Sequence, residues 1–190
     1  MNNLMIRILT LIIFIILIFF RLDQPYAKNL EIPRFVSLAS NEINVRHGDN
    51  TDRPINWIYI NLRGLPVEII QESDNWRKIR DFKNNIGWIH TGLLSGKRFV
   101  ITKDEIQTIY KQPYINEKIV ARAKKNVLLE IEKCTSYWCL VKKKIQSNKS
   151  SSIISMLKCN KIYCLINSDI IKGWINKDYI WGVYSHEIID

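Results

Sequence analysis

The sequence predicts an all-β protein made of two copies of one small barrel, because a spaced set of apolar and aromatic residues occurs twice. The same three residues, Gly-Trp-Ile, occur at Gly87-Trp88-Ile89 and at Gly173-Trp174-Ile175. Upstream, an apolar-x-apolar pair stands nine and seven residues before Trp76 and again before Trp138, with an aliphatic residue three positions after each tryptophan. The repeated positions are apolar and aromatic rather than catalytic, which favours a pair of binding or scaffolding modules over an enzyme.

Residues 1–27 are expected to be a signal or anchor helix rather than part of the fold. Arg7 precedes an apolar run from Ile8 to Phe20 in which only Thr10 is polar. This run is shorter than the roughly 20 residues that a helix needs to span a bilayer, and a basic start before a short apolar core is typical of an export signal. We expect cleavage after Ala27 and a location in the periplasm or cell envelope. A retained anchor is the alternative, and only then would the chain touch the membrane.

The rest of the chain is long enough for two modules of roughly 60–85 residues each. The formal charge of +10 falls to +9 without residues 1–27, which hold two arginines and one aspartate. A basic exported protein is drawn to acidic glycans, wall-peptide carboxylates and anionic headgroups. Nucleic acid is the other usual partner of a basic domain, but export argues against it, so we expect no nucleic-acid partner.

Short strands broken by polar turns are expected throughout the first module, which we place at residues 34–97. β-Forming residues occur on both sides of a polar loop at 47–54, and further strands are expected at 65–70, 76–80 and 86–90. No long helical period interrupts them. A small, partly open barrel is the simplest closure for this many short strands.

The second module, placed at residues 106–184, repeats this pattern with an addition. Residues 119–123 fit either a strand or a short helical turn, and a hairpin follows around Cys134 and Cys139. A Ser-rich loop then precedes a second hairpin, which has the same offsets around Tyr163 as the first has around Trp138. One of the two hairpins is therefore expected to be an extra copy inserted into this module.

The four cysteines share one spacing, Cys134-x4-Cys139 and Cys159-x4-Cys164. In an exported protein, paired cysteines with none left over indicate disulfides, and we expect each pair to close its own hairpin. Cross-pairing between the hairpins, such as Cys134 with Cys164, is one alternative. A four-thiolate zinc site is the other, but its ligands usually stand about two to four residues apart, so we expect no metal and no cofactor.

The combined motifs resemble the bacterial SH3-like domains of exported proteobacterial proteins over about residues 34–184. The matching sequence segments are Asn44-Val45-Arg46, Trp57-Ile58-Tyr59, Gly64 to Ile69, Asn75 to Asp81, Gly87 to His90, Val120-Ala121-Arg122, Cys134 to Val141, Gly173-Trp174-Ile175 and Trp181 to Tyr184. The resemblance implies two tandem small SH3-like β-barrels at the cell envelope that bind components such as peptidoglycan.

The chain departs from this family pattern at the cysteine hairpins. The family carries one such hairpin, with Gly-Trp about nine residues beyond its second cysteine. Cys164 stands nine residues before Gly173 and Cys139 stands 34 before it, yet the Trp-Cys dipeptide of the family occurs at Cys139. The sequence therefore leaves open which hairpin completes the second barrel.

The candidate contact residues are Trp57 and Trp76 with Arg46, Arg77 and Arg80. The two tryptophans lie beside polar turns, where an exposed ring can stack on a sugar or grip a peptide, although each could equally cover a core. The arginines would meet carboxylates. Trp88 and Trp174, in contrast, stand in apolar strand context and are expected in the cores.

No catalytic constellation is recognisable in the sequence. The histidines are scattered, and His90 is replaced by Asn176 in the second copy, which favours a solvated or capping role. Asp104 and Glu105 follow Thr102-Lys103 in an apparent linker without the apolar cover that acid catalysis needs. We therefore expect a non-catalytic protein that binds peptidoglycan or another anionic envelope polymer. The alternative is a structural or assembly protein that docks another exported protein through its barrels.

Overall fold

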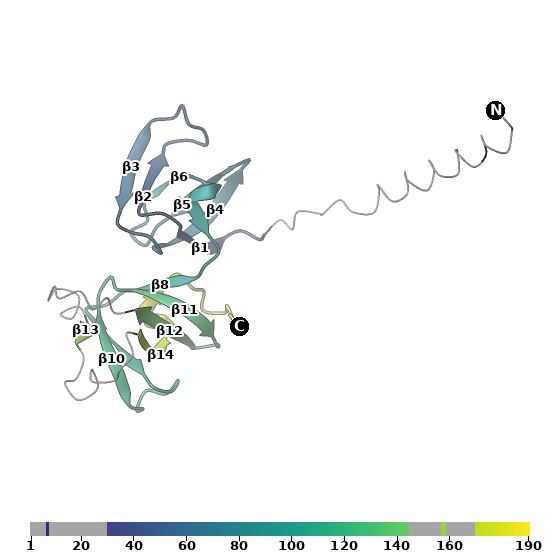
Figure 1. The fold of residues 1–190 in the computed structure, drawn as a ribbon. Helices are drawn as coiled ribbons and strands as arrows, with labels where there is room; N and C mark the ends of the chain where they lie inside the picture. Colours follow the sequence, from purple (N-terminus) through teal and green to yellow (C-terminus); the bar gives the residue numbers. More distant parts are fainter. Residues whose placement is uncertain (1–6, 8–29, 145–156, 159–169) are drawn as a thin grey trace. The chain divides into compact units, whose positions relative to one another are not determined.

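The computed structural model describes Arg7 and residues 30–144, 157–158 and 170–190 (Figure 1). All of its strands lie in one compact unit, Ile32–Asp190, and form two sheets. This confirms the all-β prediction of two tandem SH3-like modules. Among the described residues, no helix has the length and apolar character needed to cross a membrane. The expected signal or anchor helix at 1–27 lies outside them, apart from Arg7.

The first sheet has seven strands in the order β3-β2-β6-β5-β4-β1-β7. We call these strands the first module. Their bounds are β1 Arg34–Leu38, β2 Glu42–Arg46, β3 Ile55–Ile60, β4 Pro66–Ser73, β5 Trp76–Arg80, β6 Ile86–His90 and β7 Leu94–Ser95, with a short 3-10 helix η1 at Thr91–Leu93 before β7. All of the pairings are antiparallel.

The second sheet, which we call the second module, has eight strands in the order β13-β10-β9-β14-β12-β11-β8-β15. Their bounds are β8 Phe99–Thr102, β9 Ile106–Tyr110, β10 Ile119–Lys124, β11 Leu128–Cys134, β12 Trp138–Lys144, β13 Leu157–Lys158, β14 Ile170–Asn176 and β15 Ile180–Trp181, with the 3-10 helix η2 at Lys177–Tyr179. Without the edge strand β13, this order repeats that of the first sheet strand for strand.

β8 changes the expected start of the second module. It pairs with both β11 and β15, so this sheet includes residues before position 106. Asp104 and Glu105 consequently lie between β8 and β9, inside the second module, and the prediction of a linker there is wrong. Both residues are exposed, as expected for solvated carboxylates.

The duplication extends to irregularities of register. In the β2–β3 pair, the register shifts between Val45 and Arg46, and β9–β10 has the same shift beside Ile109 and Tyr110. The β4–β5 and β11–β12 pairs likewise share a shift, which follows Ile69 in one and Ile131 in the other. A β-bulge bends its strand and increases the local twist, so matching bulges give the two sheets the same curvature.

The hairpin that completes the second barrel is the one at Cys134 and Cys139. β11 and β12 occupy the sheet positions of β4 and β5, and the disulfide between these cysteines joins residues that lie opposite each other, with a Cα–Cα distance of 4.1 Å. The pairing expected for this hairpin is therefore confirmed. Cys159 and Cys164 lie outside the described residues.

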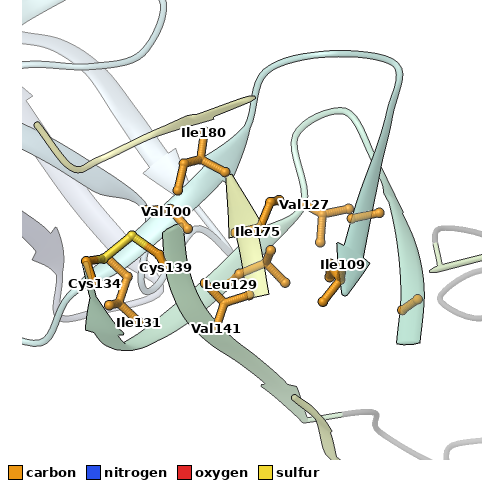
Figure 2. Packing of buried hydrophobic residues seen from close by; sticks show 12 residues of the cluster. Val100, Ile109, Val127, Leu129, Ile131, Cys134, Cys139, Val141, Ile175 and Ile180 are labelled. Atoms are coloured by element: carbon orange, nitrogen blue, oxygen red, sulfur yellow. A yellow bond between two sulfur atoms is a disulfide. The ribbon is translucent and has the colours of Figure 1, made fainter. Parts of the chain in front are cut away.

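Each module has its own apolar core, made mainly of aliphatic side chains on the alternating inner positions of its strands. Figure 2 shows the core of the second module, where Leu129, Val141 and Ile175 lie beside the buried disulfide. The first core is built around Val45, Ile79 and their neighbours. Ile101 of β8 packs into this first core.

The repeated glycine of the Gly-Trp-Ile phrase marks a close crossing of strands. A Cβ at Gly173 would stand 2.7 Å from the carbonyl oxygen of Tyr110 and 2.7 Å from a methyl group of Ile109 on β9. A Cβ at Gly87 would likewise meet Val45 and the carbonyl oxygen of Arg46 on β2. Only glycine lets the two backbones approach this closely, which explains why the residue occurs in both copies.

Candidate functional site

The outer surface of β5 and β6 carries two tryptophans of the first module, Trp76 and Trp88. Trp76 lies opposite His90 and Lys78 opposite Trp88, while the alternating residues Ile79 and Ile89 enter the core. The rings of Trp76 and His90 meet edge to face at 5.5 Å. The ammonium of Lys78 is 5.9 Å from the Trp88 ring centroid, within the range of a cation–π contact.

The same surface of the second module contains a groove of about 190 Å³. Trp138 lies opposite Asn176, as Trp76 lies opposite His90, and its ring meets Tyr110 edge to face at 5.8 Å. Ile115 is 69% exposed and Tyr179 is 46% exposed. The full lining is Ile106, Gln107, Thr108, Tyr110, Ile115, Trp138, Asn176 and Tyr179. A groove that combines aromatic walls with the polar side chains of Gln107, Thr108 and Asn176 suits an extended peptide or a sugar face.

His90 and Asn176 have the same local role in the two modules. The Nδ1 atom of His90 accepts a hydrogen bond from the amide of Gly92 at 3.2 Å, and the Oδ1 atom of Asn176 accepts one from the amide of Asp178 at 2.8 Å. Each acceptor caps the 3-10 helix that follows. The capping prediction for His90 is thus confirmed. Asparagine can replace histidine at this position because both side chains place an acceptor atom where the amide two residues later can donate to it.

The candidate tryptophans of the first module face opposite sides of the sheet. Trp57 lies opposite Val45 on the inner side, packs against the core and meets Tyr59 edge to face at 5.9 Å. Its counterpart in the second module is the buried Ala121. Trp76 lies on the outer side and is partly buried. The structure therefore does not bring Trp57 and Trp76 together on one face.

The candidate arginines each bind a partner within the chain. Arg46 donates to the carbonyl oxygen of Arg53 at 2.6 Å, and Nε of Arg77 lies 2.8 Å from a carboxylate oxygen of Glu72. Arg80 donates from Nε and Nη2 to one oxygen of Glu68, at 2.8 and 2.5 Å. By strand alternation, Arg46 and Arg80 share the outer side with Trp76, whereas Arg77 shares the inner side with Ile79.

Sequence reasoning missed the second module as a contact face. Tyr110, Trp138 and Tyr179 line the groove, although none of them was a candidate. Trp138 could have been found, because the repeat aligns it with Trp76. Tyr110 was harder to find, since it occupies the position of Arg46 and the two residues share no chemistry. Of the two tryptophans expected in the cores, Trp88 is buried and Trp174 is only partly buried.

The buried charged groups serve the fold. The carboxylate of Asp81 accepts from the hydroxyl of Tyr59 at 3.0 Å and from two backbone amides of its own turn at 2.9 Å each. Burial and this carboxylate raise the pKa of Tyr59. Lys177 donates to the carbonyl oxygens of Ser185 and Glu187, and burial lowers its pKa. Across the described ranges, no three His, Cys, Asp or Glu side chains gather as a metal site would require.

A cleft of about 480 Å³ lies beside Glu68 and Arg80. Glu68 is buried, and its other oxygen accepts a third hydrogen bond at 2.8 Å from the hydroxyl of Tyr184, whose pKa is raised by burial and by this carboxylate. Trp181 and Tyr184 also pack on the ring of Phe35, at 4.8 and 4.7 Å between centroids. Of the polar residues that line this cleft, Glu68, Arg80 and Tyr184 are bound to one another. We take the groove lined by Trp138 as the candidate ligand site.

A known domain family matches segments of both modules. No curated protein matches the chain. Two solved structures, of NlpC1 and NlpC2 from Trichomonas vaginalis, match with 13% and 14% identity and TM-scores of 0.30 each. They cover 81% and 80% of this chain, which spans 47% and 49% of theirs. The family described as bacterial SH3 domain matches residues 39–96 and 103–146, more than half of the chain. This protein therefore belongs to the bacterial SH3 domain family.

Proposed function

We propose that the protein is a non-catalytic, exported binding protein that attaches to peptidoglycan or another anionic polymer of the cell envelope. The observation that carries the proposal is the aromatic groove of the second module, formed by Tyr110, Trp138 and Tyr179 with Ile106 and Ile115. We call these five residues the aromatic groove. The rings offer flat apolar surfaces that can cover a sugar or peptide face, while Asn176 and Thr108 at its rim offer hydrogen bonds.

The charge of the chain supports an anionic ligand. Without residues 1–27 the formal charge is +9, which attracts carboxylate-rich polymers over distances set by the Debye length, about 8 Å at physiological ionic strength. The outer side of the first module presents Trp76 and His90 at the positions that Trp138 and Asn176 occupy in the groove. When one face has bound a repetitive polymer, the other face is held close to further repeats of it, which raises its effective concentration. Weak individual contacts can therefore hold the protein in place.

The proposal that the protein is exported is supported by two observations that do not involve the groove. The basic and apolar character of residues 7–20 suits a signal or anchor, and the Cys134–Cys139 disulfide suits an oxidising compartment. We place the protein in the periplasm or cell envelope on these grounds. Fractionation that finds it in the cytoplasm with Cys134 and Cys139 reduced would contradict the location while leaving the fold untouched.

The test of binding is retention on purified wall sacculi across a salt series. We expect Trp138→Ala and Tyr179→Ala to weaken retention about tenfold or more, since truncation of a buried aromatic contact residue costs about 2 kcal/mol or more. Tyr137→Ala is the matched control, because Tyr137 is 74% exposed and precedes Trp138 but does not line the groove. Near-ultraviolet circular dichroism establishes that each variant is folded.

Two outcomes would contradict the proposal in different ways. Equal retention of all three variants, lost uniformly as salt rises, would assign binding to charge alone and reject the groove. No retention of the unaltered protein at low salt, together with stoichiometric co-purification of one exported protein, would reject the polymer as ligand. The assembly role would then replace the proposed function.

A further inference from the structure

The two modules differ at one sheet edge. In the second module the strand β10 is covered by β13, which pairs antiparallel with it at Arg122 and Ala123. In the first module the corresponding strand is β3, and among the described residues it forms the end of the sheet, paired only with β2. The same strand position is thus covered in one copy and open in the other.

The open edge also lacks the usual protection against pairing. Natural edge strands carry charges, particularly lysine, or an internal proline that blocks another strand. β10 carries Arg122 and Lys124, whereas every residue of β3 is uncharged. Three isoleucines of β3 are solvent-exposed, namely Ile55 at 44%, Ile58 at 43% and Ile60 at 64%. An exposed, uncharged, β-forming edge is a template for a further strand.

The backbone of β3 is oriented for such pairing. The amide of Asn61, just after β3, donates to the carbonyl oxygen of Asn41 at 2.7 Å, so the N–H group at this end of the strand points toward β2. Because these directions alternate along a strand, the main-chain groups of Ile60 and Ile58 point away from β2. Their side chains lie on the outer side of the sheet, since Trp57 and Tyr59 face inward. The free edge therefore offers donors and acceptors at Ile58 and Ile60.

We propose that a second copy of this chain pairs with the open edge, so that two β3 strands run antiparallel about a two-fold axis centred on Ile58. This register places Ile58 opposite Ile58 of the second copy and forms two reciprocal hydrogen bonds there. Trp57 and Tyr59 of the two copies then lie opposite each other on the inner side, as facing residues must. No charged residue of β3 meets its copy, and a self-complementary patch of this kind is what a two-fold interface requires.

The interface is small, which sets the kind of dimer expected. One six-residue strand and its exposed isoleucines bury much less than the roughly 1,200 Å² of a stable standard interface. The dimer should therefore form reversibly and depend on protein concentration. Pairing of the two β3 strands also joins the seven-stranded sheets of the two copies into one continuous sheet. This inference is independent of the polymer proposed as ligand, because it uses a different part of the first module.

Analytical ultracentrifugation of the full chain, over a concentration series, tests the dimer. Ile58→Lys would place two like charges directly opposite each other, which destabilises a strand pair, and we expect dimer dissociation to become about tenfold or more easier. Ile86→Lys is the matched control, since Ile86 is 47% exposed in the same module but lies on the interior strand β6. Ile86→Lys should leave association unchanged. Both variants keep residues 1–27, so any association through that segment is the same in both.

Cross-linking tests the register. Residues in a hydrogen-bonded antiparallel pair have Cα atoms about 5.5 Å apart, within disulfide range. Ile58→Cys should therefore give a covalent dimer under mild oxidation that reductant dissolves, and Ile86→Cys should not. A protein that stays monomeric at all concentrations overturns the proposal. So does a dimer that Ile58→Lys leaves intact, or one in which both cysteine variants cross-link equally.

Discussion

Replacing Gly87 by alanine tests whether the repeated glycine exists to let two strands cross. The added Cβ would stand 3.0 Å from the Trp57 ring and 3.3 Å from the carbonyl oxygen of Arg46, and closer still to Val45. Carbon atoms at optimal contact are about 3.5–4.0 Å apart, so β2 and β6 must separate or Trp57 must move. Overpacking of this kind costs about 1–3 kcal/mol.

We expect Gly87→Ala to cost about 2 kcal/mol, because one obstacle is backbone and cannot rotate away. For a chain of this length, that corresponds to a fall in Tm of about 4–8 °C. Gly173→Ala, whose Cβ would meet the carbonyl oxygen of Tyr110 at 2.7 Å, should cost at least as much. Thermal unfolding followed by circular dichroism and by calorimetry measures both changes.

Gly96 supplies the control, because a Cβ there meets nothing within 4 Å. Gly96→Ala should be neutral or raise stability by about 0.4–1 kcal/mol, since alanine restricts the unfolded chain. If Gly87→Ala and Gly173→Ala changed Tm no more than Gly96→Ala, the close crossing would not be the reason for the Gly-Trp-Ile phrase. The explanation of the repeat given above would then be wrong.

Three further results are expected. His90→Ala should lose about 1 kcal/mol of stability in urea unfolding through the lost cap, while His90→Asn should lose almost none; equal losses would argue against capping. Arg98 lowers the pKa of Glu187 against the opposing effect of burial, so this carboxylate stabilises the fold above its unfolded pKa of about 4.3 and less as pH falls below it. Glu187→Gln should therefore flatten the loss of Tm at acid pH, and an unchanged pH profile would refute its role. Reducing the Cys134–Cys139 bond should cost about 2 kcal/mol at most, because its loop is short; collapse of the whole fold on reduction would contradict this.

The fold was largely predictable because its determinants are local and repeated. The spacing around Trp76 and Trp138 identified the two hairpins, and the Gly-Trp-Ile phrases identified the strands that pair with them. The choice between the two cysteine hairpins could not be made from spacing, since an insertion changes spacing without changing which strands pair. β8 was missed because its four residues follow β7 closely and because the strands that pair with it, β11 and β15, lie further along the chain.

The candidate site was less predictable, because exposure and pairing depend on the rest of the fold. Trp57 stands beside a polar loop in the sequence, but strand alternation turns its ring toward the core. Arg77 and Arg80 suggested carboxylate ligands, and the carboxylates they meet are Glu72 and Glu68 of the neighbouring strand. Tyr110 could be recognised only once the sheet placed it next to Trp138.

The strand order has a consequence for the timing of folding. Each module joins its first strand to its last, β1 with β7 and β8 with β15, so neither sheet is complete until its final residues are available. A chain that emerges N-terminus first can complete the first sheet once Ser95 is released. The second must wait for Trp181, and the long segment between β12 and β14 postpones that moment. Its closing contacts are long-range and therefore form slowly. During that interval the edges of β8 and β12, which later pair with β15 and β14, would be the surfaces most in need of a chaperone.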